Sequence, residues 1–286
     1  MQFATIIQYI VPQHLISRLI GKLASSRLPW LKNLFIKIFL QKYPVNMQEA
    51  IESNPFIYPT FNDFFTRALK EKARPIAHVK NSYISPVDGT ILQFGKIDEQ
   101  LIKAKGFAFT ADALLGNKAI AEKFQNGNFL VIYLAPHNYH RIHLPSDGKL
   151  ENMLYVPGKL FSVKPEHIDT IENIFARNER VANIFNTPAG SMAVVLVGAM
   201  IVGSIETSWH GVVTPNNSSQ ITGWDYTKQY LTFDQGAEIG KFKLGSTVIL
   251  LFAKDTITWS DKIKINQPIK MGEIIGSEIQ SPKASA

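Results

Sequence analysis

Short runs rich in Val and Ile, separated by Gly, Pro and Asn, set the limits on how this 286-residue chain folds. From about Tyr83 onward they predict buried strands, at residues 129–134, 191–205, 211–213 and 247–252. Helical patterns near residues 110–124 and 166–176 interrupt these runs without the regular alternation of a doubly wound parallel sheet. We therefore predict an α+β fold with a mainly antiparallel β core.

The first 42 residues follow a different pattern, with apolar side chains at helical spacing and no Asp or Glu. One apolar stripe follows Pro12, and a second follows Pro29, a residue suited to the first turn of a helix. Tyr43-Pro44 ends the second stripe, because proline disfavours helix in the residue before it. The segment carries six Lys and Arg residues, and with them nearly all of the chain's net charge of +7. We predict two amphipathic helices of about 12 residues each.

These two helices allow two interpretations. A basic amphipathic helix can lie in the headgroup layer of an anionic membrane, or it can pack on a protein core and leave its basic face in water. Neither helix is long enough to span a bilayer, which takes about 20 apolar residues. The uncharged run 187–205 has that length, but its glycines and β-branched residues favour buried strands. Because the rest of the chain is nearly neutral, a nucleic-acid-binding surface is not expected.

The remaining elements are shorter. Helices are predicted at Met47–Asn54 and Phe61–Leu69, and the aromatic stripe of the second is assigned to the core. The segment Pro268–Glu273 is expected to form a turn before a last strand. The tail Ser281–Ala286 is expected to be loose.

Histidines are the first candidates for chemistry, because the chain has no cysteine to form a disulfide, a thiolate metal site or a nucleophile. Three of the seven, His137, His140 and His143, lie in one short stretch. On a helix they would share a face and could ligate a metal, whereas on the expected strand His140 lies opposite the other two. Acid–base catalysis by His140 and His143 is the alternative, since imidazole titrates near neutrality.

A second set of candidates is Asp88, His143 and Ser246. Their residue types are those of an acid that orients a base, the base itself and a nucleophile. Ser246 follows Gly245, and glycine permits a close approach of the hydroxyl to the preceding carbonyl. Asp88 stands in Ser85–Gly89, a turn sequence that also occurs in lipoyl- and biotin-carrier barrels, for which Lys270 would be the modified lysine. The sequence pattern leaves open whether the three residues meet.

Six blocks of sequence follow one another along the chain, namely Phe61–Arg67, Ser85–Gly89, Tyr139–His143, Pro157–Val163, Val202–Thr207 and Phe242–Val248. In this order they resemble phosphatidylserine decarboxylase, in its bacterial membrane-associated form. The resemblance covers most of the chain, from about residue 12 to residue 265. Leu244–Thr247 corresponds to the processing signature of that family, and the ordered blocks make the match specific.

The resemblance implies a proenzyme that cleaves itself. Ser246 would attack the carbonyl of Gly245 to form an ester, and elimination would then break the chain between residues 245 and 246. The products would be a large chain, 1–245, and a small chain, 246–286, whose first residue becomes a pyruvoyl group. Pyruvate, formed from Ser246, would thus be the covalent cofactor. In the family, the base corresponds to His143 and the acid that orients it to Asp88.

The resemblance also implies decarboxylation of phosphatidylserine to phosphatidylethanolamine, a step of phospholipid biosynthesis. The amine of the lipid headgroup would form a Schiff base with the pyruvoyl carbonyl, which takes up the electrons left behind when CO₂ departs. By the same resemblance, His140 is the proton donor. No separate cofactor-binding motif and no metal site are expected, and His137-Asn138 departs from a charged pair that is common in the family.

A lipid substrate favours the membrane interpretation of the first two helices. Residues 1–43 are expected to associate peripherally with the cytoplasmic side of the cell membrane, and residues 44–286 to form the catalytic domain. The expected partners are phosphatidylserine in an anionic membrane and the two chains of one precursor, and a homodimer is left open. A non-catalytic membrane-binding or carrier protein is disfavoured, because the serine, histidine and aspartate are all present. A histidine-ligated metallohydrolase is the other alternative.

Overall fold

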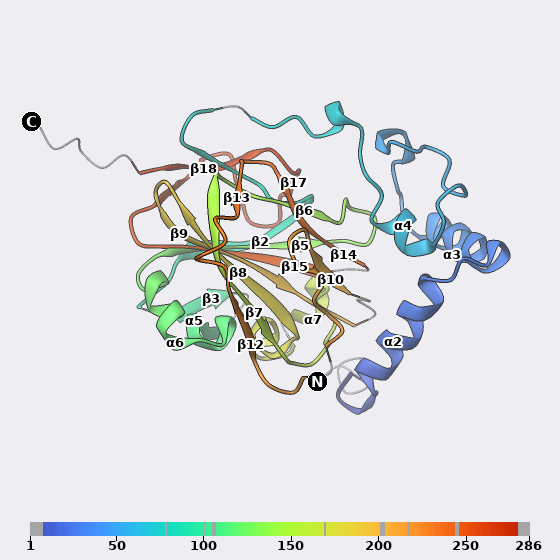
Figure 1. The fold of residues 1–286 in the computed structure, drawn as a ribbon, viewed down its shortest axis with the longest axis horizontal. Helices are drawn as coiled ribbons and strands as arrows, with labels where there is room; N and C mark the ends of the chain where they lie inside the picture. The colour runs from blue at the N-terminus through green and yellow to red at the C-terminus, as the bar shows by residue number, and fades with distance from the viewer. Residues whose placement is uncertain are drawn as a thin grey trace, which may run out of the picture.

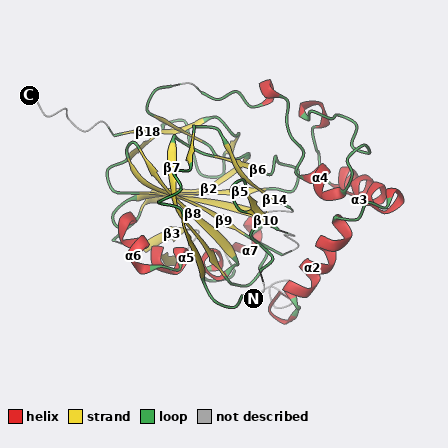
Figure 2. Cartoon of the chain, in the orientation of Figure 1, coloured by secondary structure: helices red, strands yellow, loops and turns green. Residues whose placement is uncertain are grey.

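The computed structural model of the chain has a body of β-sheets with three helices along one side (Figure 1), α2 (Gln13–Ala24), α3 (Pro29–Lys42) and α4 (Phe61–Phe65). It describes residues 8–77, 79–99, 101–104, 107–168, 170–200, 204–216, 218–243 and 246–279. Figure 2 shows that strands make up most of the body, whereas the longest helices belong to the N-terminal part. The predicted α+β class, with an antiparallel core and N-terminal helices, is confirmed.

The two N-terminal helices form where their apolar spacing predicts them, but later helices are shorter than predicted. Met47–Glu49 is a single 3₁₀ turn, and α4 ends at Phe65. A tertiary contact explains the shorter helices. Ala50 follows the first segment and Leu69 follows the second, and the two residues form an antiparallel bridge instead of continuing the helices. The other helices are α5 (Ala111–Leu115), α6 (Lys118–Ala121), α7 (Pro165–Ile168) and α8 (Ile174–Arg177), with 3₁₀ turns at Glu71–Ala73 and Glu122–Phe124.

The runs rich in Val and Ile form the centre of the main sheet, which has nine strands in the described part of the chain. Its order is β12 (Thr222–Asp225), β7 (Gly148–Val156), β8 (Arg180–Thr187), β9 (Gly190–Val197), β15 (Ser246–Phe252), β5 (Asn128–Leu134), β2 (Gly89–Lys96) and β17 (Pro268–Ile269), and β13 (Thr232–Phe233) pairs with β7. β15 lies between β9 and β5, antiparallel to both. The uncharged run at 187–205 therefore contains a buried strand, as predicted.

A smaller sheet carries the histidine-rich segment. It consists of β11 (Gly211–Val212), β10 (Ile205–Thr207), β14 (Glu238–Phe242) and β6 (Arg141–His143), in that order. A third sheet contains β1 (Ser82–Ile84), β18 (Ile274–Glu278) and β16 (Ile257–Trp259), and β3 (Leu101–Ala104) pairs with β4 (Phe107–Thr110). The predicted turn at Pro268–Glu273 contains the short strand β17 and then turns at Gly272, whose φ is 90°. The tail Ser281–Ala286 lies outside the described residues.

The N-terminal helices present apolar side chains outward as well as inward. Inward, Ile36 of α3 and Ala24 pack with three phenylalanines of α4 in a cluster separate from the main core, Phe61, Phe64 and Phe65. Outward, α2 exposes Leu15, Leu19 and Leu23, and α3 exposes Trp30, Leu34 and Ile38. In the part of the chain that the structure describes, no helix has the length and apolar character to cross a bilayer.

Polar side chains hold α2 against the body. The buried residues of this helix are Gln13, Ser17 and Ala24, none of them a large apolar residue. The Oε1 atom of Gln13 accepts a hydrogen bond from the Leu160 N–H at 2.7 Å, and the imidazole Nε2 of His14 donates to the Gly158 carbonyl at 2.9 Å. The leucines of α2 are therefore free to face outward.

Asn178 ties the loop 158–163 to the main sheet, and its removal provides a test of the fold. Its fully buried amide donates to the carbonyls of Phe161 and Gly198 and accepts from the Phe161 N–H. We expect Asn178→Ala to lower the free energy of unfolding by about 2–4 kcal/mol, because buried backbone groups lose their partners. Urea denaturation measures the change.

The control is Asn186→Ala, an exposed asparagine of β8, for which the expected change is within about 0.5 kcal/mol. Equal effects of the two substitutions would contradict the role assigned to Asn178.

Candidate active site

The chain on both sides of the Gly245–Ser246 bond is held against one segment, residues 134–140. Ser246 begins β15 and pairs with Leu134, the last residue of β5. On the other side, the N–H of Phe242 donates to the His140 carbonyl at 3.0 Å. Gly245 and the side chain of Ser246 lie outside what the structure describes, so the predicted nucleophile is located only through its backbone.

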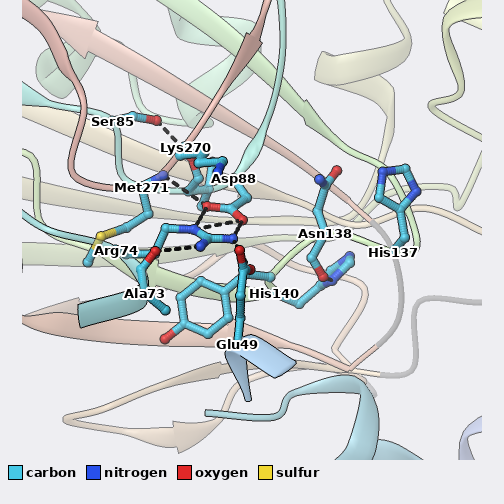
Figure 3. A network of polar contacts seen from close by, with 12 residues as sticks. Glu49, Ala73, Arg74, Ser85, Asp88, His137, Asn138, His140, Lys270 and Met271 are labelled. Atoms are coloured by element: carbon cyan, nitrogen blue, oxygen red, sulfur yellow. Dashed lines mark hydrogen bonds and ion pairs between the residues drawn. The ribbon is translucent and has the colours of Figure 1, made fainter. Parts of the chain in front are cut away.

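Asp88 lies in a turn where its carboxylate is held by Arg74 (Figure 3). The Oδ1 atom accepts from Arg74 Nε at 2.8 Å and from the Met271 N–H at 2.9 Å, and the same guanidinium binds Glu49 at 2.9 Å. Burial alone would lower the pKa of Arg74, but the two carboxylates raise it above its ordinary value. The next residue, Gly89, lies where β2 approaches β5 closely. A Cβ at this position would lie 2.4 Å from the Tyr133 carbonyl oxygen, so only glycine fits.

His143 lies beside this turn, since its backbone N–H donates to the Pro86 carbonyl at 2.9 Å. Its imidazole Nδ1 donates to the Gly236 carbonyl at 2.7 Å, and the Tyr139 hydroxyl lies 3.1 Å from Nε2. A carbonyl only accepts, so Nδ1 carries the proton and Nε2 is the acceptor for the tyrosine. Burial lowers the pKa of His143, and the hydrogen bond to the Gly236 carbonyl and the charges of Glu238 and Asp88 act in the opposite direction. Both ring nitrogens bond to groups other than Asp88.

His140 is fully buried against α4, with its ring centroid 4.1 Å from that of Phe65. The imidazole Nδ1 donates to the Asn138 carbonyl at 2.8 Å, and Nε2 has no hydrogen-bond partner among the described residues. Burial lowers the pKa of His140 to about 3, so the ring is neutral at pH 7. Its Nε2 therefore carries a lone pair, which can accept a proton.

The three neighbouring histidines do not assemble a metal site in the portion of the chain with described positions, where no cluster of three or more His, Asp or Glu has suitable geometry. His137 contributes its carbonyl, which accepts from Arg67 Nη2 at 3.1 Å.

Comparison with known sequences assigns the chain to a family. The sequence model of phosphatidylserine decarboxylase matches residues 61–277, which include Asp88, His140, His143 and Ser246. The chain belongs to the phosphatidylserine decarboxylase family. A second model, described as PSD, matches residues 3–44 and thus the N-terminal helices. The predicted family and the predicted enzyme class, a decarboxylase, are confirmed.

Individual relatives agree with the family model over nearly the full chain. Phosphatidylserine decarboxylase proenzymes of Shewanella woodyi and Vibrio cholerae are 50% and 49% identical to it, and each comparison covers 93% of this chain and 95% of the relative. The proenzyme of Bordetella avium is 49% identical, over 94% of this chain and 92% of the relative.

Several side chains of the candidate site have no signal of their own in the sequence. Arg74 and Glu49 lie outside the six ordered blocks, and only the ion pairs with Asp88 reveal them. Arg67 and Tyr139 lie inside the blocks, but their contacts with His137 and His143 appear only in the folded chain.

The neutral histidines make stability depend on pH. Burial lowers the pKa of His137, His140 and His143, so below about pH 6.5 the unfolded chain binds protons that the folded chain does not. Stability therefore falls as the pH falls, by at most about 1.4 kcal/mol per pH unit for each histidine. We expect His140→Gln to reduce this slope between about pH 6 and pH 5, as measured by urea denaturation at several pH values.

The control is His210→Gln, which changes an exposed histidine that contacts Tyr226 and Trp224. An unchanged slope in His140→Gln would show that His140 is not held neutral by the fold.

Proposed function

We propose that this chain is a self-processing phosphatidylserine decarboxylase that forms phosphatidylethanolamine with a pyruvoyl group made from Ser246. The observation that carries the proposal is the pairing of the chain on both sides of Gly245–Ser246 with the segment 134–140. This segment ends at His140, and His143 follows three residues later. The relatives are named proenzymes, which agrees with a cleavage step.

His143 is the proposed base for cleavage. Its Nε2 is unprotonated and accepts from Tyr139, so it can accept the Ser246 hydroxyl proton once that contact is exchanged. The serine oxygen then bonds to the Gly245 carbonyl carbon, and the peptide C–N bond breaks to leave an ester. The negative charges of Glu238 and Asp88 favour the imidazolium that forms. Subsequent elimination at the ester releases residues 1–245 with a new carboxylate, and the dehydroalanine left at position 246 takes up water and loses ammonia to become the pyruvoyl group.

His140 is the proposed proton donor in decarboxylation. A pyruvoyl group at position 246, the first residue of β15, would supply the electron sink for the loss of CO₂. The Nε2 of His140 is a buried polar atom without a partner among the described residues, which fits proton transfer at this end of the strand. Because the ring is neutral at pH 7, it must first accept a proton, which the substrate ammonium releases as its nitrogen becomes nucleophilic. His140 then returns that proton to the carbon that has lost CO₂.

Residues 1–43 are the proposed membrane-associating part, on the cytoplasmic side of the cell membrane, and residues 44–286 the catalytic part. The support is the outward direction of the apolar side chains of α2 and α3. Five basic residues of this segment are also exposed, Arg18, Lys22, Arg27, Lys37 and Lys42. The sixth, Lys32, is buried and donates to the Phe56 carbonyl, so it does not contribute to attraction by anionic lipid.

Mass spectrometry of the denatured protein tests the cleavage. We expect two fragments, 1–245 and 246–286, with the smaller one blocked at its N-terminus by pyruvoyl. Ser246→Ala removes the nucleophile and is expected to leave one intact chain. A parent protein that stays in one piece after incubation at neutral pH would contradict the proposal.

His140→Gln separates the two reactions within the same measurement. It is expected to cleave, because His143 and Ser246 are intact, but to lose at least about 100-fold in CO₂ release from phosphatidylserine. Full decarboxylase activity in this variant would remove His140 from the mechanism.

Membrane association is tested by replacing the exposed leucines of α2. The variant Leu15→Gln/Leu19→Gln/Leu23→Gln is expected to bind vesicles that contain phosphatidylserine at least about 100-fold more weakly, because three apolar side chains no longer enter the interface. Co-sedimentation measures the binding. The matched control is Ile221→Gln/Ile265→Gln, which changes exposed apolar residues of the body; equal loss in both variants would place the anchor elsewhere.

A further inference from the structure

A pocket of about 190 Å³ lies where the segment after α3, the end of α4 and the turn around Asp88 meet. Its wall includes five charged residues and a histidine, Glu49, Arg67, Arg74, Asp88, Lys270 and His137. Pro44 and Asn46, which follow α3 directly, also line it. The pocket therefore adjoins both the exposed helices and the histidine-rich segment.

The pocket wall carries three cations, Arg67, Arg74 and Lys270, and two carboxylates, a net charge of +1. The two carboxylates, Glu49 and Asp88, are both bound to Arg74. Lys270 is exposed to water. Arg67 is thus a buried cation of the wall that contacts no carboxylate among the described residues, although the charges of Asp88 and Glu49 act on it from a distance.

Arg67 also has unused hydrogen-bond donors. The residue is 4% exposed, its guanidinium lies over the Phe64 ring, and among the described residues only Nη2 has a hydrogen-bond partner, the His137 carbonyl. Nε and Nη1 are buried without a partner among the described residues. Leaving such donors unpaired is costly. A phosphate group, with negatively charged acceptor oxygens, is a strong partner for a guanidinium.

The contacts of Arg67 and its neighbours place this cation next to the proposed proton donor. Arg67 binds the His137 carbonyl, and Arg141 Nε in turn donates to the Thr66 carbonyl at 2.9 Å. Phe65 stacks on His140. After burial, the charge of Arg67 is among the causes that lower the pKa of both His137 and His140.

We propose that Arg67 binds the phosphodiester of the lipid headgroup in this pocket, an assignment that rests on the proposed decarboxylation. In phosphatidylserine, one oxygen and one methylene separate the phosphorus from the reacting carbon, so a phosphate held by Arg67 keeps that carbon close to His140. The substrate carboxylate is the less suitable anion, because it leaves as neutral CO₂ and a cation bound to it would stabilise the ground state. The phosphodiester keeps its charge throughout.

Binding of a soluble product tests this assignment without turnover. Dihexanoyl phosphatidylethanolamine contains the phosphodiester and lacks the carboxylate, and isothermal titration calorimetry measures its affinity for the self-cleaved full chain. We expect Arg67→Met to weaken this binding by about 10- to 100-fold, and to raise the KM for dihexanoyl phosphatidylserine by a similar factor. Arg67→Lys, which keeps the charge, is expected to recover part of the loss.

Arg141→Met is the control, because it removes the guanidinium bond to the Thr66 carbonyl, together with the ion pair to Glu238, and leaves Arg67 in place. Equal weakening in Arg141→Met would make the effect structural and overturn the assignment. A raised KM with unchanged phosphatidylethanolamine binding would assign Arg67 to the carboxylate and would also overturn it. Inorganic phosphate that binds as tightly as the lipid, with the same dependence on Arg67, would indicate a free-phosphate site instead.

Two further outcomes keep this assignment separate from the proposed function. If Arg67→Met does not fold, the assignment depends on Arg67→Lys, and wild-type affinity and KM in that variant would overturn it. A parent chain that binds the lipid through Arg67 but neither cleaves nor releases CO₂ would contradict the proposed decarboxylation and leave phosphodiester binding supported.

Discussion

Strand β15 is held between β5 and β9 along nearly its whole length, and the candidate site depends on that position. Its residues Val248–Phe252 are fully buried, so the strand cannot shift its register without exposing apolar side chains. This fixes the backbone of Ser246 opposite Leu134. The pairing of β15 with β5 and β9 would retain the small chain after cleavage. Two further strands of that chain also pair with the large chain, β17 with β2 and β18 with β1.

Both proposed fragments also contribute to the surroundings of Asp88. Arg74 precedes the proposed cleavage position and Met271 follows it, and both donate to the Asp88 carboxylate. Close to this charged group lie two histidines that burial keeps neutral. Ion pairing keeps Asp88 and Arg74 charged, whereas burial keeps the two nearby histidines neutral. Neighbouring groups can therefore hold different protonation states.

The N-terminal helices connect the site to the surface. α3 packs on α4 through Ile36, and α4 in turn supports His140 through Phe65. The outward apolar side chains belong to α2 and α3, whereas the inward phenylalanines belong to α4, so α3 packs on the body and still leaves apolar side chains exposed. An enzyme that draws its substrate from a lipid surface benefits from this arrangement, because the pocket lined by Arg67 begins directly after α3.

Local periodicity was sufficient to predict α2, α3 and the central strands, because a regular repeat of apolar residues specifies one buried face. The ordered blocks were sufficient for the family and for the candidate residues Asp88, His140, His143 and Ser246. Periodicity did not reveal that Met47–Glu49 is only a turn, because the bridge between Ala50 and Leu69 joins segments that are separate in the sequence. Nor could periodicity reveal the ion pair between Arg74 and Asp88, the proton on Nδ1 of His140 and His143, or the unpaired donors of Arg67. Those features depend on which distant groups burial brings together, and only the tertiary structure decides that.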